Sequence, residues 1–383
     1  MSEVRTSHGR SPDVVVIGGG IVGVACAAHL AAAGRRVQVF EIEAIAAGAS
    51  GRNSGVVQHP FDPVFVALHV ETLALYRDLE AATGGAFRLP AAPVGLLAVT
   101  PDDDAARRLA GSLAIQHPQL RPTFLAATEV RMLEPSIAPG IAACRLDIGY
   151  PVAPAAATRA YADRAEALGV TFTVGVGARP WIENGALRGV QTSTGERVAA
   201  QDVVVAAGPW TPAVVDPTGG WRPIRPLWGV VVAVGLAAPP VHVLEEAEID
   251  IEPGPDKGEP GHAFSLVTAT GASSLGSTFL DDQPDAVATV PSLVERGRRF
   301  VPEIATAKLG AARVCARPLS LDGRPLLGRA PGNEGLWIAA GHGPWGISTG
   351  PASGRLIAEL VTGVVDAPPP ELDPARFGSI SAG

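Results

Sequence analysis

The stretch Asp13–Glu41, DVVVIGGGIVGVACAAHLAAAGRRVQVFE, decides the fold. Four β-branched residues, Val14–Ile17, run directly into Gly18, Gly20 and Gly23, which have the spacing G-x-G-x-x-G. The first glycine permits a tight turn, the second lets the backbone approach a pyrophosphate, and the third lets the helix pack closely on the strand. We therefore expect a strand, a glycine turn and a helix whose N-terminus receives phosphate groups.

The residues after this turn complete a βαβ unit. An apolar helical segment extends to Ala33, Gly34 ends it, and a second strand covers Val37–Phe40. Glu41 lies 23 residues after Gly18, where an acid is expected to accept hydrogen bonds from the ribose hydroxyls of a dinucleotide. A glycine pattern alone also occurs in purely structural turns, but both strands and the acid together favour dinucleotide binding.

Composition excludes several classes of function. The 383 residues are 47% apolar and carry a net charge of −8, with basic residues scattered singly, so neither nucleic acid nor membrane insertion is expected. Cys26, Cys144 and Cys315 are too few and too dispersed for a disulfide framework or a zinc site, and no metal is expected. The N-terminal segment lacks a signal-peptide pattern. These features predict a soluble, cytoplasmic protein.

Apolar periodicity and turn residues predict the remaining elements. Helices are expected over Pro63–Thr83, from Asp103 towards His117, over Ala127–Glu134, Pro154–Leu168 and Pro291–Phe300, and from about Ser348 to Val361. Strands are expected over Phe87–Leu89, Gly95–Thr100, Val170–Val176, Asp202–Ala206, Gly229–Leu236, Ala263–Ala269, Ser274–Leu280 and Leu336–Ala340. Loops rich in proline and glycine, such as 252–261, separate the later strands.

This order of elements predicts an α/β protein with an inserted, mainly antiparallel sheet. A Rossmann-like nucleotide-binding domain would comprise residues 11–85, 150–218 and 318–366. A substrate-binding domain would comprise residues 86–149 and 219–317, and residues 367–383 would form a C-terminal tail. The loop 48–55, GASGRNSG, is made of small and polar residues, so we expect its backbone to close on the cofactor.

Five motifs spread over the chain resemble the FAD-dependent D-amino acid oxidase family, which includes glycine oxidase, sarcosine oxidase and D-amino acid dehydrogenases. They are VVVIGGGIVG with VFE, GASGRNSGV, VVVAAGPWTP, ARPLSLDGRPLLG and LWIAAGHGPWGISTGPASGRLIAEL. The resemblance implies a two-domain fold in which FAD lies extended, with its flavin between the domains. The residues it implies for FAD are Gly18, Gly20, Ile21, Val22, Gly23, Glu41, Ser50, Arg52, Asn53, Ser54, Val176, Gly208, Cys315, Gly341, His342, Gly343, Gly346 and Ile347.

The resemblance also implies the reaction. An amino acid or secondary amine that carries a carboxylate would lose hydride from carbon to flavin N5, and the imine would hydrolyse to an oxo acid. Arginine suits the carboxylate because its planar fork donates two parallel hydrogen bonds. We expect Arg317, in the Arg-Pro pattern, to bind the substrate carboxylate. Trp345, His262 and Tyr150 are further candidates for the substrate pocket, with His59 and Trp228 behind them, although each of these types also serves as ordinary packing.

Two positions leave alternatives open. Cys315 lies where some sarcosine oxidases link FAD covalently, but a buried free cysteine is more often a small core residue, so the link is possible and not favoured. The place of the oxygen-activating lysine of sarcosine oxidases is near Ser274, and neither Lys257 nor Lys308 is close to it in sequence. The electron acceptor is therefore oxygen or another molecule.

Two other functions stay open at this point. The βαβ unit alone would also fit an NAD-dependent dehydrogenase, and the chain could be an electron-relaying FAD subunit of a heteromeric amine dehydrogenase. A homo- or hetero-oligomer is possible in either case.

Overall fold

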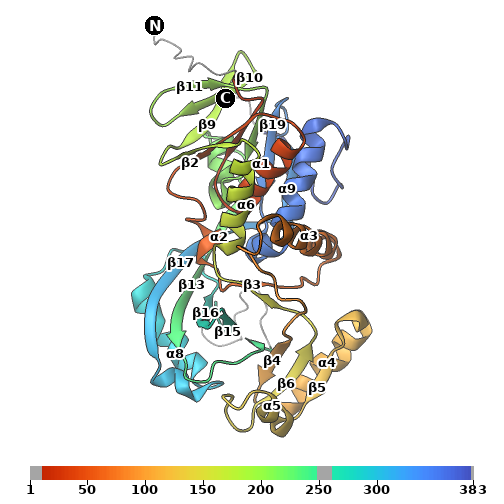
Figure 1. Ribbon diagram of the computed structural model, residues 1–383, viewed down its shortest axis with the longest axis vertical. Coiled ribbons are helices and arrows are strands. Elements are labelled where there is room, and N and C mark those ends of the chain that lie inside the picture. The colour runs from red at the N-terminus through yellow and green to blue at the C-terminus, as the bar shows by residue number, and fades with distance from the viewer. Residues whose placement is uncertain (1–10, 248–260, 381–383) are drawn as a thin grey trace.

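The computed structural model describes residues 11–247 and 261–380 and contains two large sheets (Figure 1). The first sheet has the order β18-β19-β12-β1-β2-β8, in which all strand pairs are parallel except β18 with β19. Its strands are β1 (Val14–Ile17), β2 (Val37–Glu41), β8 (Thr171–Val174), β12 (Asp202–Val205), β18 (Leu326–Arg329) and β19 (Leu336–Ala340). No helix in the described part of the chain has both the length and the apolar character to cross a membrane.

Strand β1 is buried on both faces, which explains its unbroken run of β-branched residues. Val14 and Val16 point into one core cluster and Val15 and Ile17 into another, as the two-residue period of a strand requires. The first cluster lies under the helices α1 (Ile21–Ala32), α3 (Pro63–Ala82), α6 (Ala156–Ala167) and α9 (Gly346–Thr362). The second cluster includes Val190 and Val198 of a separate three-stranded sheet, β9 (Ala178–Glu183), β10 (Ala186–Thr192) and β11 (Arg197–Ala199).

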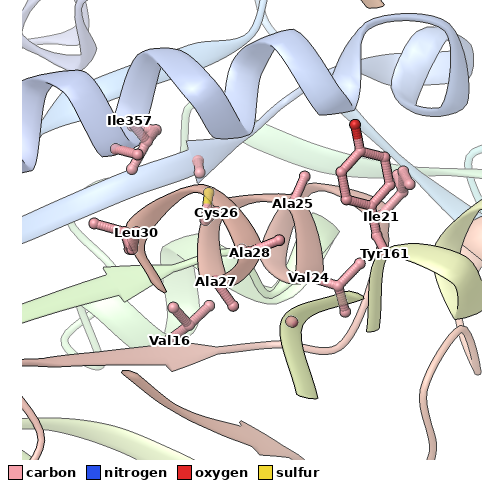
Figure 2. Close-up of a cluster of buried hydrophobic side chains, with 14 of the residues drawn as sticks. Val16, Ile21, Val24, Ala25, Cys26, Ala27, Ala28, Leu30, Tyr161 and Ile357 are labelled. Atoms are coloured by element: carbon pink, nitrogen blue, oxygen red, sulfur yellow. The ribbon is translucent and has the colours of Figure 1, made fainter. Parts of the chain in front are cut away.

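Helices α1 and α9 come from opposite ends of the chain and pack against each other (Figure 2). A Cβ atom at Gly354 of α9 would lie 2.7 Å from the Ala25 Cβ and from the Cys26 backbone nitrogen of α1. Only glycine permits this approach, because the nearest atoms include rigid helix backbone. One turn further along α9, Ile357 packs over Leu30 in the same core.

The second sheet is the eight-stranded β17-β13-β16-β15-β14-β4-β6-β5. Its strands are β4 (Leu96–Thr100), β5 (Thr123–Leu125), β6 (Ala142–Leu146), β13 (Ile224–Gly235), β14 (Val243–Glu246), β15 (His262–Ala269), β16 (Ala272–Thr278) and β17 (Lys308–Ser320). The helices associated with it are α4 (Asp103–Gln116), α5 (Ala127–Leu133) and α8 (Ala286–Gly297). Helix α8 closes a core in which Phe264 and Phe300 stack with ring centroids 4.6 Å apart.

The α/β fold with an inserted, mainly antiparallel sheet is confirmed. The strand expected over Phe87–Leu89 is wrong: the Arg77 guanidinium takes the Leu89 carbonyl at 2.7 Å, so that group has a side-chain partner instead of a strand. Helix α8 starts earlier than Pro291 because the Asp285 carboxylate caps it by accepting from Val287 N–H and Ala288 N–H. The domain boundaries stay a prediction, and the expected loop 252–261 lies almost entirely outside the described residues.

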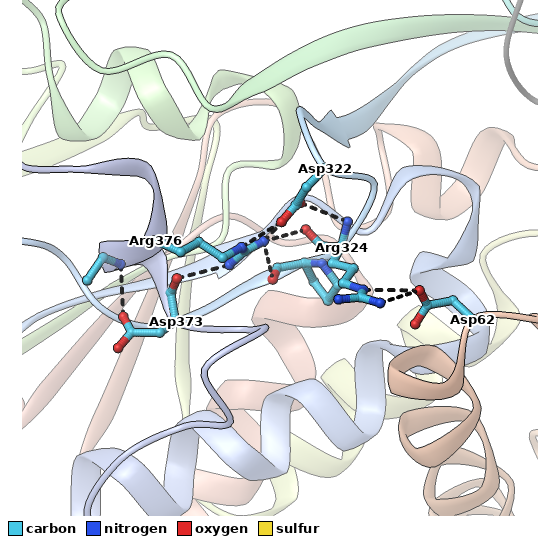
Figure 3. Close-up of polar contacts among 7 residues, drawn as sticks. Asp62, Asp322, Arg324, Asp373 and Arg376 are labelled. Atoms are coloured by element: carbon cyan, nitrogen blue, oxygen red, sulfur yellow. Dashed lines mark hydrogen bonds and ion pairs between the residues drawn. The ribbon is translucent and has the colours of Figure 1, made fainter.

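The C-terminal segment packs back onto the first sheet through a polar network (Figure 3). Arg376 donates to Asp322 at 2.7 Å and to the Arg324 carbonyl at 2.9 Å. Arg324 in turn donates to Asp62 at 3.0 Å, and the Asp62 carboxylate also caps the first turn of α3. The tail therefore fixes the turn before β18 and the start of α3 at the same time.

The contact between α1 and α9 gives a stability prediction. Gly354→Ala adds a methyl group against helix backbone, and overpacking of this kind costs about 1–3 kcal/mol, so the free energy of unfolding in urea should fall by about that amount. Gly111→Ala is the matched control, because Gly111 is also inside a helix but has no atom within 4 Å of its added Cβ. It should gain about 0.5–1 kcal/mol from helix propensity. Equal effects of the two substitutions would contradict the close contact.

Candidate active site

A cavity of about 800 Å³ lies between the two sheets and takes its lining from both of them. One end is formed by the glycine turn after β1 and by the end of β2. The other end is formed by β13, β14, β15 and β17 and by the turn that precedes α9. The cavity therefore joins the predicted nucleotide site to the second sheet.

The glycine turn has the geometry that its spacing predicts. Gly18 has φ +116°, and a side chain there would collide with the Ala206 carbonyl. A Cβ at Gly20 would come within 3.1 Å of the Ser50 hydroxyl, and one at Gly23 would collide with the Gly18 carbonyl. Gly18 and Gly20 line the cavity, together with Ile21 and Val22 at the start of α1, whereas Gly23 packs behind them. The positive end of α1 thus faces open space, as a phosphate site requires.

The acid at the end of β2 also lies at this end of the cavity. One Glu41 carboxylate oxygen accepts from Gly19 N–H at 2.6 Å and the other from Glu43 N–H at 2.8 Å. Glu41 lines the cavity and Val176 does not: Val176 N–H donates to the Glu41 carbonyl at 3.1 Å, and the next two residues line the cavity in its place.

The small-residue loop contains a short helix, α2 (Ala49–Arg52), and Ser50, Arg52, Asn53 and Ser54 all line the cavity. The Ser50 hydroxyl accepts from Ile21 N–H at 2.9 Å and so joins the loop to α1. The Asn53 amide donates to the Ser50 carbonyl at 2.9 Å and to the carbonyl of Ala49 at 3.1 Å. Asn53 therefore shapes the loop from within.

The turn before α9 closes the opposite side. His342, Gly343, Gly346 and Ile347 line the cavity, while Gly341, with φ +90°, forms the bend behind them. Burial lowers the pKa of His342 to about 3, so the ring is neutral, and its Nε2 lies 2.9 Å from the Ser353 hydroxyl. The N-terminus of α9 consequently presents backbone N–H groups and no side-chain charge to the cavity.

Helix α3 holds the first turn of α9 in place. The Tyr76 hydroxyl donates to the Ile347 carbonyl at 2.7 Å, and the Thr72 hydroxyl accepts from Ala352 N–H at 3.2 Å. The Ser348 hydroxyl accepts from the backbone N–H of Gln58 at 2.8 Å. These bonds are buried, so they fix where the positive end of α9 points.

These features fit FAD. The glycine turn leaves room for a pyrophosphate, and Glu41, at the end of β2, could accept from ribose hydroxyls. Gly208, in the turn after β12, also lines the cavity. The uncharged N-terminus of α9 suits the N1–C2=O edge of a flavin, which becomes negative on reduction. No side chain of residues 11–247 and 261–380 fills the space between the glycine turn and this N-terminus.

Arg317 lies at the second-sheet end of the cavity. Its guanidinium donates to the Ser277 hydroxyl at 2.6 Å and to the Thr278 carbonyl at 2.8 Å, and stacks over Phe279 at 4.6 Å. It lies flat over Gly229, where any side chain would collide with it. No carboxylate of the described residues forms an ion pair with it, and burial lowers its pKa. Three of its five N–H groups stay available for an anion.

The other substrate candidates divide into two groups. Trp345 and Trp228 line the cavity. Tyr150, His262 and His59 do not line it: Tyr150 is in β7 (Tyr150–Pro151), paired with β3 (Val56–Val57). The structure thus brings Arg317 and the two tryptophans together and leaves the other three outside.

Several polar residues that no sequence motif pointed to also line the cavity. Two of them are Gln58, in the segment after β3, and Glu245, on β14. The sequence VLEE in β14 carried a signal, because two adjacent acids on a strand point to opposite faces and one of them must face the interior.

Cys315 is 6% exposed and borders the cavity opposite Gly229. Burial raises the pKa of its thiol, which therefore stays protonated and weakly nucleophilic at neutral pH.

Comparison with known proteins gives a consistent result. The family model DAO, FAD dependent oxidoreductase, matches residues 13–360. A glycine oxidase from Geobacillus kaustophilus (strain HTA426) is 29% identical over 368 residues, covering 91% of this chain and 92% of that protein. A crystal structure of glycine oxidase from Geobacillus kaustophilus superposes with a TM-score of 0.78 at 26% identity, covering 97% of this chain and 99% of that one. L-proline dehydrogenase from P. horikoshii has a TM-score of 0.80 at 23% identity, covering 97% and 100%, and shares the fold.

The state of Cys315 gives a test of how the cofactor is held. Because its thiol is buried and protonated, we expect acid precipitation of the holoenzyme to release all of the yellow flavin into the supernatant. Colour that stays in the wild-type pellet but leaves the pellet of Cys315→Ser would show a thioether and contradict this expectation.

Proposed function

The chain belongs to the DAO family of FAD-dependent oxidoreductases, and from this membership we propose that it oxidises the C–N bond of an amino acid or secondary amine that carries a carboxylate. FAD, when bound, supplies the two-electron acceptor. The substrate carbon loses a hydride, the C–N bond becomes an imine, and water converts the imine to an oxo acid and a free amine or ammonia. The NAD-dependent alternative is excluded, because the family uses FAD.

The observation that carries the proposal is Arg317. It is a guanidinium without a carboxylate partner among the described residues, held rigidly at the second-sheet end of the cavity. A buried cation in such a place stabilises a bound anion far more than an exposed one does, since water screens it less. The planar fork also orients the anion, so that the bound carboxylate would fix the position of the neighbouring C–N bond.

The remaining residues would restrict how the substrate lies. Trp228 and Trp345 supply flat apolar walls, which would exclude water and confine the rest of the substrate. No protein base is required, because a neutral amine can lose hydride directly. The relatives named glycine oxidase act on an amine beside a carboxylate, and this supports the proposal.

The electron acceptor is the open part of the reaction. Ser274, near the position of the lysine of sarcosine oxidases, accepts a hydrogen bond from Arg313 at 3.0 Å, and Lys308 is exposed at the start of β17. Lys257 lies outside the described residues. We propose that either oxygen or another acceptor reoxidises the flavin, and the experiment below compares the two routes.

The reaction is tested by anaerobic mixing of the holoenzyme with glycine, D-amino acids, N-methyl amino acids and cyclic imino acids. We expect bleaching of the flavin by some of these compounds and none by the amines that lack the carboxylate. Admission of oxygen and of an artificial acceptor in separate runs then compares the two routes of reoxidation. Bound FAD that no amine bleaches would reject the proposal and favour an electron-relaying subunit.

The role of Arg317 gives a quantitative prediction. Arg317→Ala should raise KM and lower kcat/KM for carboxylate substrates by a factor that corresponds to about 2–4 kcal/mol, because a desolvated charge pair is lost. Arg225→Ala is the control, since Arg225 is an exposed arginine of β13 paired with Asp281. The flavin spectrum should be unchanged in both variants. An unchanged kcat/KM in Arg317→Ala would remove this residue from the site.

A further inference from the structure

Gln58 forms a buried corner of the cavity with an unused hydrogen-bond acceptor. Its side chain is 9% exposed, and its amide nitrogen donates to a Glu245 carboxylate oxygen at 3.3 Å. Its amide oxygen is buried and has no partner among the described residues. A buried amide oxygen without a donor costs free energy, so a group that binds here and donates hydrogen bonds would be stabilised.

Glu245 adds a carboxylate to the same corner. It follows Leu244 on β14, pairs with Ser265 of β15 and Ala98 of β4, and lines the cavity. The next residue, Glu246, points away, where its carboxylate accepts from Arg296 at 2.7 Å. No described cation forms an ion pair with Glu245, and burial raises its pKa to about 7 although the hydrogen bond from Gln58 opposes this shift.

The corner therefore offers several acceptors, and the donors beside Glu245 are the Gln58 amide nitrogen and the hydroxyl of Ser265, its neighbour on β15. The Gln58 amide oxygen is an acceptor, and the Glu245 carboxylate, once ionised, has acceptors and no donor. An ammonium group has three donors and a positive charge, so it satisfies both residues at once. A second carboxylate or an apolar group would leave the acceptors without partners.

The distance between Arg317 and Glu245 decides which ammonium group of a substrate can reach Glu245. The Arg317 guanidinium is held by Ser277 and Thr278 of β16, and Glu245 is on β14, two strands away. Two strand spacings correspond to about 10 Å. The α-ammonium of an amino acid is bonded to the carbon next to the carboxylate, so it cannot reach Glu245 while Arg317 holds that carboxylate. A cation at the far end of a side chain can reach it.

We propose that Gln58 and Glu245 bind a second, distal cationic group of the substrate, so that the enzyme selects basic amino acids over neutral ones of equal length. This inference rests on the proposed function for the Arg317 end of the site. It makes Glu245 a specificity-determining residue and leaves the reacting amine free beside the flavin.

A ligand that cannot react tests the corner by itself. The compound 6-aminohexanoate has a carboxylate and a distal ammonium but no α-amine, and hexanoate lacks the ammonium. In titrations of the holoenzyme, followed by the change in the flavin spectrum, we expect 6-aminohexanoate to bind at least tenfold more tightly than hexanoate. Glu245→Gln keeps the side-chain shape and should remove this difference, and Gln58→Leu should reduce it.

Glu246→Gln is the matched control, because it removes the adjacent carboxylate on the opposite face and should keep the tenfold difference. Thermal melting of each variant separates loss of binding from loss of folding. In the wild type, 6-aminohexanoate should bind more tightly as the pH rises through 7, because Glu245 loses its proton. This rise should be absent in Glu245→Gln. The titratable groups on the elements around Glu245 are Glu246, His262 and His59, and any rise left in Glu245→Gln would belong to them.

Turnover distinguishes this inference from the proposed function. Both stereoisomers of lysine and norleucine are mixed anaerobically with the wild type and with Glu245→Gln. A strong preference for lysine over norleucine that disappears in the variant supports the inference. Equal bleaching by lysine and norleucine, unchanged in the variant, overturns the inference and leaves the proposed function intact. If no amino acid bleaches the flavin, the proposed function fails. Equal binding of 6-aminohexanoate and hexanoate would, in that case too, reject the cation site at Gln58 and Glu245.

Discussion

The backbone contact between α1 and α9 at Gly354 is the constraint on which the site depends. It brings a helix from the start of the chain against one from the end. Residues at the N-termini of both helices line the same cavity. Each N-terminus carries a partial positive charge, and each would face a different part of an extended dinucleotide bound in this cavity. Helix α3 and the C-terminal segment then secure this pair through Tyr76 and through Arg324 with Asp62. A shift of one helix along the other would misplace both anion-binding ends together.

The charged groups that line the cavity differ between its two ends. The nucleotide end has helix termini, the acceptor Glu41 and the ion pair of Arg52 with Glu43. Among the described residues, the second sheet contributes one cation, Arg317, and one buried acid, Glu245. These two side chains come from strands that are far apart in the sheet order, so they do not neutralise each other. A bound molecule with both an anionic and a cationic group would pair with Arg317 and Glu245 at once. Two charged side chains can therefore set the orientation of a substrate in a largely apolar cavity.

Local sequence predicted the glycine turn and the strand end that form one end of the cavity, because the requirements of these segments are local. Gly18 and Gly20 need their backbone geometry, and Glu41 follows its strand directly. Arg317 was chosen through a short motif, and the structure brings it to the cavity. Local sequence could not show which other polar side chains face the cavity, because this depends on strand register and on the crossing of segments far apart in the chain. Gln58 and Glu245 face it, whereas Tyr150 and His262 do not. The strand prediction for Phe87–Leu89 was wrong because the Leu89 carbonyl accepts a hydrogen bond from the Arg77 side chain. Local strand propensity carries no information about such a contact.

The order of these elements along the chain also has a consequence for synthesis on the ribosome. The glycine turn and α1 are made first, the strands of the second sheet are made in between, and the turn before α9 appears only after residue 341. Until then α1 lacks the helix that covers its Ala25–Cys26 surface, and this apolar surface is exposed on the nascent chain. A cofactor that needs both helix ends can therefore bind fully only late in synthesis, after α9 has formed.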